Sequence, residues 1–283
     1  MFDARRGPPF MHKVTSDRLE EPPGGWIAIG DAAGRSPAAD ADGGRMVPGQ
    51  ALGRCGPASW SLRWSSHEPE LRHLGRELLY RAPLPRTKLT SPAPRASFDG
   101  VLELAGTEAI ELHGWPGMVG HNWGSEHAER WIWLHAVGFA EAPEAWLDVA
   151  LGRIKLGGAL TPWIANGALS LDARRYRLGG LGARGLHVRE TVAGCSLRLG
   201  GERGLSLEAR VEVPAGTAAG WRYADPDGSA HDVVNCSIAA LQLELRLPDE
   251  AASRTLRSAH GGAYELGMRE RDHGIPLAPF ADG

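Results

Sequence analysis

The sequence predicts an all-β protein built from two consecutive antiparallel, barrel-like domains. Beyond residue 166, short strand-like segments recur at regular intervals between turns rich in glycine and aspartate, a pattern typical of barrels and sandwiches. Upstream, two apolar segments with period-two alternation are joined by a short Pro/Glu turn, and together they predict a β-hairpin. A chain of 283 residues is long enough to bury one large β core or two moderate ones.

The composition divides the chain into three parts. Residues 1–57 are rich in glycine, proline, aspartate and alanine, so we expect a poorly ordered segment or an edge of the first domain. Residues 58–165 are assigned to the first barrel; within them, 67–81 carries leucines at helical spacing after an initial turn. Residues 166–283 form the second barrel, and in its last strand, 263–268, pairing of Glu265 with an arginine is one expectation.

The predicted hairpin holds the residues that we expect to carry chemistry. Five of the ten tryptophans lie between residues 114 and 155. Period two places Trp131, Trp133 and His135 on one face of the first strand. On the second strand it places Trp146 and Asp148 together, with leucine and valine on the opposite face. An acid beside indole rings, on an otherwise apolar strand, is therefore the first place to look for a site.

Two interpretations of Asp148 stay open at this stage. If its carboxyl group faces the interior, desolvation disfavours the charged form and the acid stays protonated, ready to protonate an alkene or activate a carbonyl group. Alternatively, Asp148 pairs with a distant arginine or faces solvent and has no chemical role. Two interpretations of the tryptophans also stay open. Their indoles either build a hydrophobic core, or they line a pocket in which the faces of the indole rings stabilise a carbocation.

Composition excludes several classes of function. A net charge of −3 gives no field that would attract nucleic acid or an anionic membrane. The three cysteines lie far apart, so neither a disulfide framework nor a structural zinc site is expected. The N-terminus lacks the apolar segment of a signal peptide, and no run is long enough to span a membrane, although transient membrane contact is left open. We expect a cytoplasmic protein.

Two further motifs are set aside. Gly180–Gly185 fits the G-x-G-x-x-G pattern, but a strand-like segment follows it, whereas a dinucleotide site needs a helix there. A metal site could be imagined from four side chains, yet none of them stands at a familiar ligand spacing. Structural histidines are the expectation, and no metal site is predicted for His121, Glu126, His127 and His135.

The segment Gly120–Gly124, GHNWG, followed by Arg130–Leu134 and a strand ending in aromatic-x-Asp, resembles the superfamily of carotenoid hydratases (hydroxyneurosporene synthases) and tocopherol cyclases. The later Tyr223–Gly228, Asn235–Ser237 and Tyr264–Gly267 resemble the second-barrel pattern of bacterial relatives. The resemblance covers roughly residues 58–275 and implies two lipocalin-like barrels.

The resemblance also implies a site. In the hydratases, a His-x-Trp pair and a Tyr-x-Asp pair on neighbouring strands form it, and the aspartate is the proposed proton donor to a C=C bond. By position, His121 and Trp123 match the first pair, and Trp146 and Asp148 match the second. Trp146 stands where the hydratases have tyrosine, so the phenol is missing and the addition of water is in doubt as the outcome.

The leading hypothesis is therefore a cofactor-free enzyme of hydratase or cyclase type acting on an apolar terpenoid, polyene or polyketide-like molecule. Asp148 would donate the proton, and His121 would orient Asp148 or relay its proton. The substrate would contact Trp123, Trp131, Trp133, Trp146, His135 and Asn122.

Two alternatives remain. One is a carrier that only binds a hydrophobic molecule in a barrel, which a salt-bridged or exposed Asp148 would favour. The other is a pericyclic cyclase that needs no essential acid, because folding the substrate supplies much of the rate.

Overall fold

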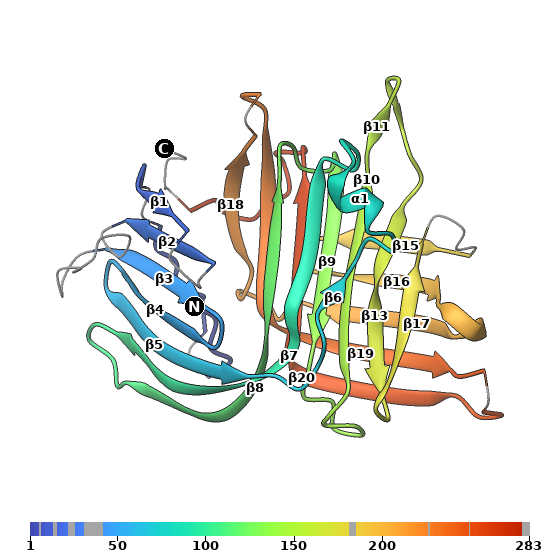
Figure 1. Ribbon diagram of the computed structural model, residues 1–283, viewed down its shortest axis with the longest axis horizontal. Coiled ribbons are helices and arrows are strands. Elements are labelled where there is room, and N and C mark those ends of the chain that lie inside the picture. The colour runs from blue at the N-terminus through green and yellow to red at the C-terminus, as the bar shows by residue number, and fades with distance from the viewer. Residues whose placement is uncertain are drawn as a thin grey trace. The chain divides into compact units, whose positions relative to one another are not determined.

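The computed structural model describes residues 1–5, 7–13, 16–21, 26–30, 42–180, 185–225, 227–248 and 250–278. Within these residues the chain is almost entirely β, with two large antiparallel sheets, as Figure 1 shows. The predicted all-β class is therefore confirmed. In the described segments, helix is confined to α1, Leu78–Arg81, and a 3-10 turn at Glu202–Gly204. None of the described helices has the length and apolar character needed to cross a bilayer.

The first sheet contains eight strands in the order β1-β2-β3-β4-β5-β7-β6, with β8 paired to β7. Strands β1 to β4 come from residues 19–55, so this stretch forms the edge of the sheet. The segment with leucines at helical spacing gives a two-residue strand and the single turn α1. The strands are β1 Leu19–Glu20, β2 Ile27–Gly30, β3 Gly43–Val47, β4 Gln50–Cys55, β5 Ala58–Ser65, β6 Leu71–Arg72, β7 Thr87–Leu104 and β8 Ile110–Gly124.

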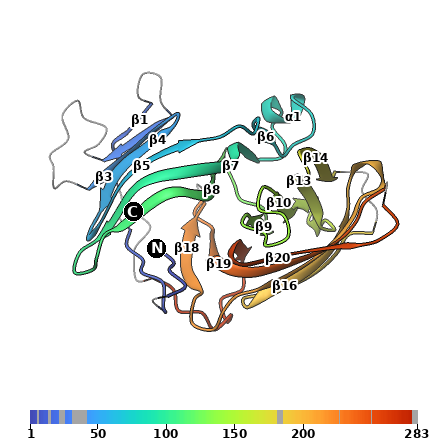
Figure 2. The same cartoon turned by 90° about the horizontal axis from the view of Figure 1, so that it is seen from below.

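The second sheet contains ten strands in the order β14-β13-β10-β9-β20-β19-β17-β16-β15, with β18 paired to β19. Figure 2 shows several of these neighbours along the sheet. Strands β11, Lys155–Leu156, and β12, Ala159–Leu160, form a separate two-stranded ribbon. The other strands are β9 Arg130–Ala136, β10 Trp146–Arg153, β13 Ile164–Leu171, β14 Arg174–Gly179, β15 His187–Thr191, β16 Gly194–Gly200, β17 Ser206–Glu212, β18 Ala219–Ala224, β19 Ala230–Arg246 and β20 Arg254–Met268.

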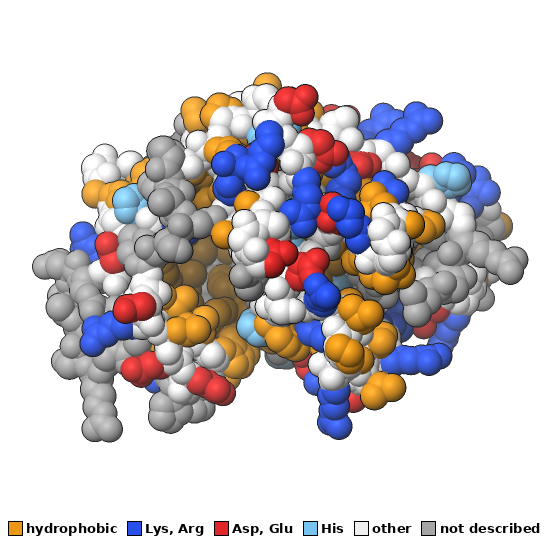
Figure 3. All heavy atoms as spheres, turned by 90° about the horizontal axis from the view of Figure 1, so that it is seen from above, with side chains coloured by type: hydrophobic (Ala, Val, Ile, Leu, Met, Phe, Trp, Pro, Cys, Tyr) orange, Lys and Arg blue, Asp and Glu red, His pale blue; other side chains and the backbone are white. Residues whose placement is uncertain are grey.

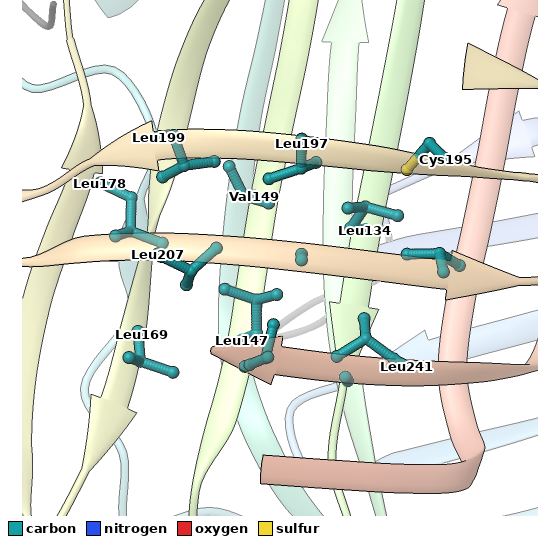
Figure 4. Close-up of a cluster of buried hydrophobic side chains, with 14 of the residues drawn as sticks. Leu134, Leu147, Val149, Leu169, Leu178, Cys195, Leu197, Leu199, Leu207 and Leu241 are labelled. Carbon is teal, nitrogen blue, oxygen red and sulfur yellow. The ribbon is translucent and has the colours of Figure 1, made fainter. Parts of the chain in front are cut away.

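The second sheet curls into a barrel around a core of leucines. A bridge between Leu178 in β14 and Gly201, just beyond β16, joins one edge strand to the strand next to the opposite edge. Alternate residues of its strands point inward, and these side chains are almost completely buried. Figure 4 shows part of this core, including Leu134, Leu147, Val149, Leu169, Leu178, Leu197, Leu199, Leu207 and Leu241. The interior of this barrel is thus occupied by the protein's own side chains.

The chain forms two compact units that do not follow one another in sequence. The first comprises the described residues of 1–10, 70–94 and 120–278, and the second comprises those of 11–69 and 95–119. Strands β7 and β8 therefore contribute residues to both units. This division differs from the expected boundaries at 57 and 165, because 120–165 pairs strand by strand with the segments that follow it.

Charge is distributed as the composition predicts. Acidic and basic side chains are interspersed on the face shown in Figure 3, in keeping with the net charge of −3. Such a mixture of signs gives no strong attraction to a polyanion on that face.

Candidate active site

The predicted hairpin exists, and it fixes which side chains share a face. Strands β9 and β10 pair with Asp148 opposite His135 and with Ala150 opposite Trp133. Ile132, Leu134 and Ala136 point into the barrel core, so the intervening Trp131, Trp133 and His135 point outward. The site residues therefore lie on the outer face of the leucine-filled barrel, and all those described below belong to the first compact unit.

Asp148 is completely buried and its two carboxylate oxygens are held by three side chains. The Ser91 hydroxyl donates to Oδ2 at 2.5 Å, and the Trp133 indole N–H donates to Oδ1 at 3.0 Å. The Nε2 atom of His73 lies 3.3 Å from Oδ1. Among the described residues, the ionisable partner is thus a histidine rather than an arginine. A buried carboxylate with this many partners is fixed in position.

The charge state of Asp148 differs from the expected one. Burial raises the pKa of its carboxyl group, but the electrostatic interaction and contact with His73, the interaction with His135 and the Ser91 hydrogen bond more than offset burial. The pKa of Asp148 is therefore lowered, and the group is ionised at neutral pH. The prediction of a protonated Asp148 is wrong, because it considered desolvation without the partners that the fold supplies.

The two histidines beside Asp148 are also buried. His135 donates from Nε2 to the carbonyl oxygen of Pro94 at 2.9 Å, and burial lowers its pKa although Asp148 opposes the shift. His135 is therefore neutral at physiological pH. The Nδ1 atom of His73 is buried with no hydrogen-bond partner in the described part of the chain.

The structure brings some of the predicted site residues to Asp148 and leaves others elsewhere. Trp133 and His135 flank it, and Trp146 is buried beside it in a small cluster with Leu71 and Ala168. The guanidinium of Arg175 lies 4.9 Å from the centroid of the Trp146 ring.

The predicted His-x-Trp pair lies in an exposed part of β8. His121 and Asn122 are exposed, and His121 stacks on Trp123 with ring centroids 5.1 Å apart. Among the described residues, His121 is not a hydrogen-bond or ion-pair partner of Asp148, so the structure does not support its expected role in orienting this acid. The Asp148 carboxylate is contacted by His73 and Ser91 instead.

His73 and Ser91 escape prediction because nothing local marks them. His73 lies in the segment with leucines at helical spacing, and Ser91 lies in a stretch broken by prolines. They are 75 and 57 residues from Asp148, and only the folded chain brings them together. Ser91 in β7 is the register partner of Leu71 in β6, which places His73 near it.

A second carboxyl group, Glu265, lies on the same face of the sheet. It stands on β20 opposite Trp133, and Asn235 of β19 is its partner on the other side. The Trp131 indole N–H donates to Oε1 at 2.7 Å, and the Asn235 amide donates to Oε2 at 3.1 Å. No arginine pairs with Glu265 within the described segments, so that expectation is wrong.

The pKa of Glu265 is shifted in the direction that was expected for Asp148. Burial raises the pKa of its carboxyl group, and the hydrogen bonds from Trp131 and Asn235, with the charge of His127, only partly oppose the shift. Two N–H dipoles stabilise an anion less than a nearby full positive charge does. The face therefore carries two carboxyl groups whose pKa values are shifted in opposite directions, downward for Asp148 and upward for Glu265.

The indole of Trp131 is placed by a glycine. Gly267 is the register partner of Trp131, and a Cβ atom built on Gly267 would lie 2.2 Å from the indole ring. The ring thus lies directly against the backbone of β20, where its N–H reaches Glu265. Two surface pockets of about 620 and 510 Å³ lie elsewhere, and Asp148 and Glu265 line neither of them.

Comparison with known proteins supports the fold. The chain is 29% identical over 219 residues to the uncharacterized proteins Rv0493c and MT0513 of two Mycobacterium tuberculosis strains. The match covers 73% of this chain and 61% of those proteins, so the chain spans about three fifths of the length of the curated relatives it matches. No family model matches the chain.

Among solved structures, CghA with Sch210972 superposes with a TM-score of 0.54 at 12% identity, covering 86% of this chain and 73% of CghA. The predicted fold is confirmed. Kievitone hydratase from Nectria haematococca gives a TM-score of 0.47 at 8% identity, covering 85% of this chain and 71% of that enzyme.

Proposed function

We propose that the protein is an enzyme of hydratase or cyclase type that protonates an apolar terpenoid, polyene or polyketide-like substrate. The observation that carries the proposal is the pair of carboxyl groups on one sheet face with opposite pKa shifts, Asp148 downward and Glu265 upward. Carboxyl groups driven apart in this way are the usual mark of an acid and its fixed counter-charge. CghA, to which this chain is similar in fold, has a crystal structure with Sch210972, and this is a precedent for a small-molecule complex of the fold.

In this proposal Glu265 is the proton donor. Its two oxygens accept hydrogen bonds from the N–H groups of Trp131 and Asn235. In the described part of the chain, the proton of the carboxylic acid itself therefore has no acceptor. Transfer of that proton to a C=C carbon breaks the O–H bond of Glu265 and leaves a carbocation and a carboxylate. The same two N–H groups then stabilise the carboxylate. Loss of a proton from the cation, or from water that adds to it, returns the proton to Glu265.

Asp148 and the indoles stabilise positive charge as it develops. Asp148 is too deeply buried to touch a substrate, so we assign it as a positioning residue that fixes Trp133 through the indole N–H. Trp131 and Trp133 are partly exposed on this face, and their ring faces attract a cation through the quadrupole. Proton transfer and charge stabilisation both come from side chains, and the chemistry needs no cofactor.

The test compares Glu265→Gln with the wild-type enzyme and with Glu208→Gln, an exposed strand glutamate of the same sheet. Turnover of a panel of polyene, terpenoid and polyketide-like substrates is measured by mass spectrometry. Loss of the acid should lower kcat by about 10²- to 10⁴-fold while apolar ligands still quench tryptophan fluorescence. Glu208→Gln should match wild type.

Full turnover by Glu265→Gln, with Asp148→Asn inactive but folded, would return the donor role to Asp148 and contradict the proposal.

A carrier of a hydrophobic molecule is the second candidate function. One observation favours it, since a fully buried Asp148 in contact with a histidine also suits a purely structural carboxylate. Binding of an apolar ligand with no product from the wild-type protein, and equal affinity in Glu265→Gln, would establish the carrier instead.

A further inference from the structure

A second cluster of ionisable side chains lies at the end of the β18–β19 hairpin. Asp225 follows β18 directly, and His231 is the second residue of β19, where it pairs in register with Tyr223. His127 comes from the connection between β8 and β9, 98 residues before Asp225. The cluster is thus assembled by the fold from three separate segments of one compact unit.

The two imidazoles of the cluster, those of His127 and His231, converge on the Asp225 carboxylate. His127 Nδ1 lies 2.6 Å from Oδ1, and His231 Nδ1 lies 3.0 Å from Oδ2. One candidate ligand atom from each residue falls within 4.8 Å of the other two. Asp225 is further held by the backbone N–H of His127 at 3.1 Å and by the hydroxyl of Ser229 at 3.2 Å. The carboxylate is therefore positioned before any ligand arrives.

His231 gives an independent indication that a partner is missing. Its side chain is completely buried, yet neither ring nitrogen makes a hydrogen bond of acceptable geometry in the described residues. Leaving a buried polar atom without a partner is unfavourable, and native structures rarely tolerate it. The contact between His231 Nδ1 and Asp225 lacks the geometry of an N–H hydrogen bond. A cation bound beside Asp225 would give this nitrogen a partner without requiring that geometry.

We propose that His127, Asp225 and His231 bind a divalent transition-metal ion of the Zn²⁺ class. Two imidazoles and one carboxylate are the donors that such ions prefer, and three protein ligands leave a coordination position open. His127 is 28% exposed, so the open position faces solvent on its side. Zn–N and Zn–O bonds of about 2.0–2.2 Å require the ligand atoms to separate slightly from their hydrogen-bond distances.

The surroundings hold the imidazoles in place. The Trp131 ring stacks on His127 at 5.0 Å between centroids and meets His231 edge-on at 5.1 Å. Arg269 is the nearby positive charge that opposes a cation, and it is ion-paired with Glu129 at 3.0 Å. Orientation of ligating histidines by such neighbours is a usual property of metal sites.

The experiment titrates Zn²⁺ into tag-free, EDTA-treated protein by isothermal titration calorimetry. Wild type should bind one ion with a dissociation constant in the micromolar range or tighter. His127→Gln, Asp225→Asn and His231→Gln should each weaken binding by at least 10-fold. The matched control is His113→Ala, which removes an exposed histidine outside the cluster and should bind as wild type does.

Absence of saturable Zn²⁺ binding by wild type would overturn the proposal, and so would unchanged affinity in all three variants. If the His231 variant does not fold, the wild-type Co²⁺ spectrum decides instead. Visible d–d bands of a low-coordinate N/O site are expected, and a spectrum equal to that of aqueous Co²⁺ would overturn the site. Both readouts measure binding, so they are independent of the proton transfer proposed for Glu265.

Discussion

Asp148 and Glu265 show how the neighbours of a carboxyl group decide its charge. Both are shielded from water, which by itself favours the neutral acid. Asp148 has His73, His135 and the Ser91 hydroxyl beside it, and its interactions with these three side chains outweigh the desolvation. Glu265 has an indole and an amide, which are only dipoles. The same functional group therefore has a lowered pKa at one position and a raised pKa at the other.

This difference predicts how stability depends on pH. The pKa of Glu265 is higher in the folded protein than the value of about 4.3 in the unfolded chain. Between these two pKa values the folded protein holds a proton that the unfolded chain has released, so stability falls as pH rises. We expect a slope of up to about 1.4 kcal/mol per pH unit from this one group.

The measurement is urea denaturation of wild type and Glu265→Gln between pH 4 and pH 8. The variant should lose less stability than wild type as pH rises through this window, because glutamine does not titrate. Parallel curves for the two proteins would show that the pKa of Glu265 is not raised.

On the scale of elements, the register of β9 against β10 and β20 places the indoles. Gly267 on β20 and Gly152 on β10 both face Trp131, one on each side. Only Gly267 lies against the ring, where even a methyl group would overlap it. A Cβ atom on Gly152 would instead make an ordinary contact of 3.5 Å with Ala128.

We therefore expect Gly267→Ala to destabilise the protein by about 1–3 kcal/mol through overpacking and to displace the Trp131 indole from Glu265. Urea denaturation and the near-ultraviolet circular dichroism of the tryptophans provide the measurement. Gly152→Ala is the matched control and should preserve the spectrum. An unchanged spectrum in Gly267→Ala would mean that the ring does not pack against this strand.

The β9–β10 hairpin shows how far sequence alone reaches. Its strands, its turn and the faces of Trp131, Trp133 and Asp148 follow from period two, and the structure confirms them. The partners of Asp148 do not follow, because His73 and Ser91 come from β6 and β7 regions distant in sequence. Without those partners the charge of Asp148 could only be predicted from burial, and that prediction was wrong.

On the scale of the molecule, the all-β class was predictable because alternation and turn residues are local signals. The membership of the compact units was not, since residues 70–94 join 120–278 while 95–119 belong to the other unit. Strands β7 and β8 pass between units without a break, so no change in composition marks the boundary. The expected boundary at 165 falls inside β13, which pairs with β10 in the same sheet.

The packed barrel interior gives a prediction at this scale. Leu207 is completely buried in the core of the second sheet, and Leu207→Ala should lower the free energy of unfolding by about 2–5 kcal/mol. Leu156→Ala, at a leucine that is 52% exposed, should change it by less than about 0.5 kcal/mol. Equal, small effects in denaturant would mean that the interior is loosely filled.

Closure of the second sheet through Leu178 and Gly201 has a consequence for where chemistry can take place. A barrel whose interior is filled by its own leucines acts as a scaffold and does not enclose a ligand. The packed barrel fixes the positions of the indoles, acids and imidazoles on its outer face, where the register of the hydrogen-bonded strands sets the spacing between them. Efforts to re-engineer the protein for new molecules should accordingly redesign that outer face and leave the leucine core intact.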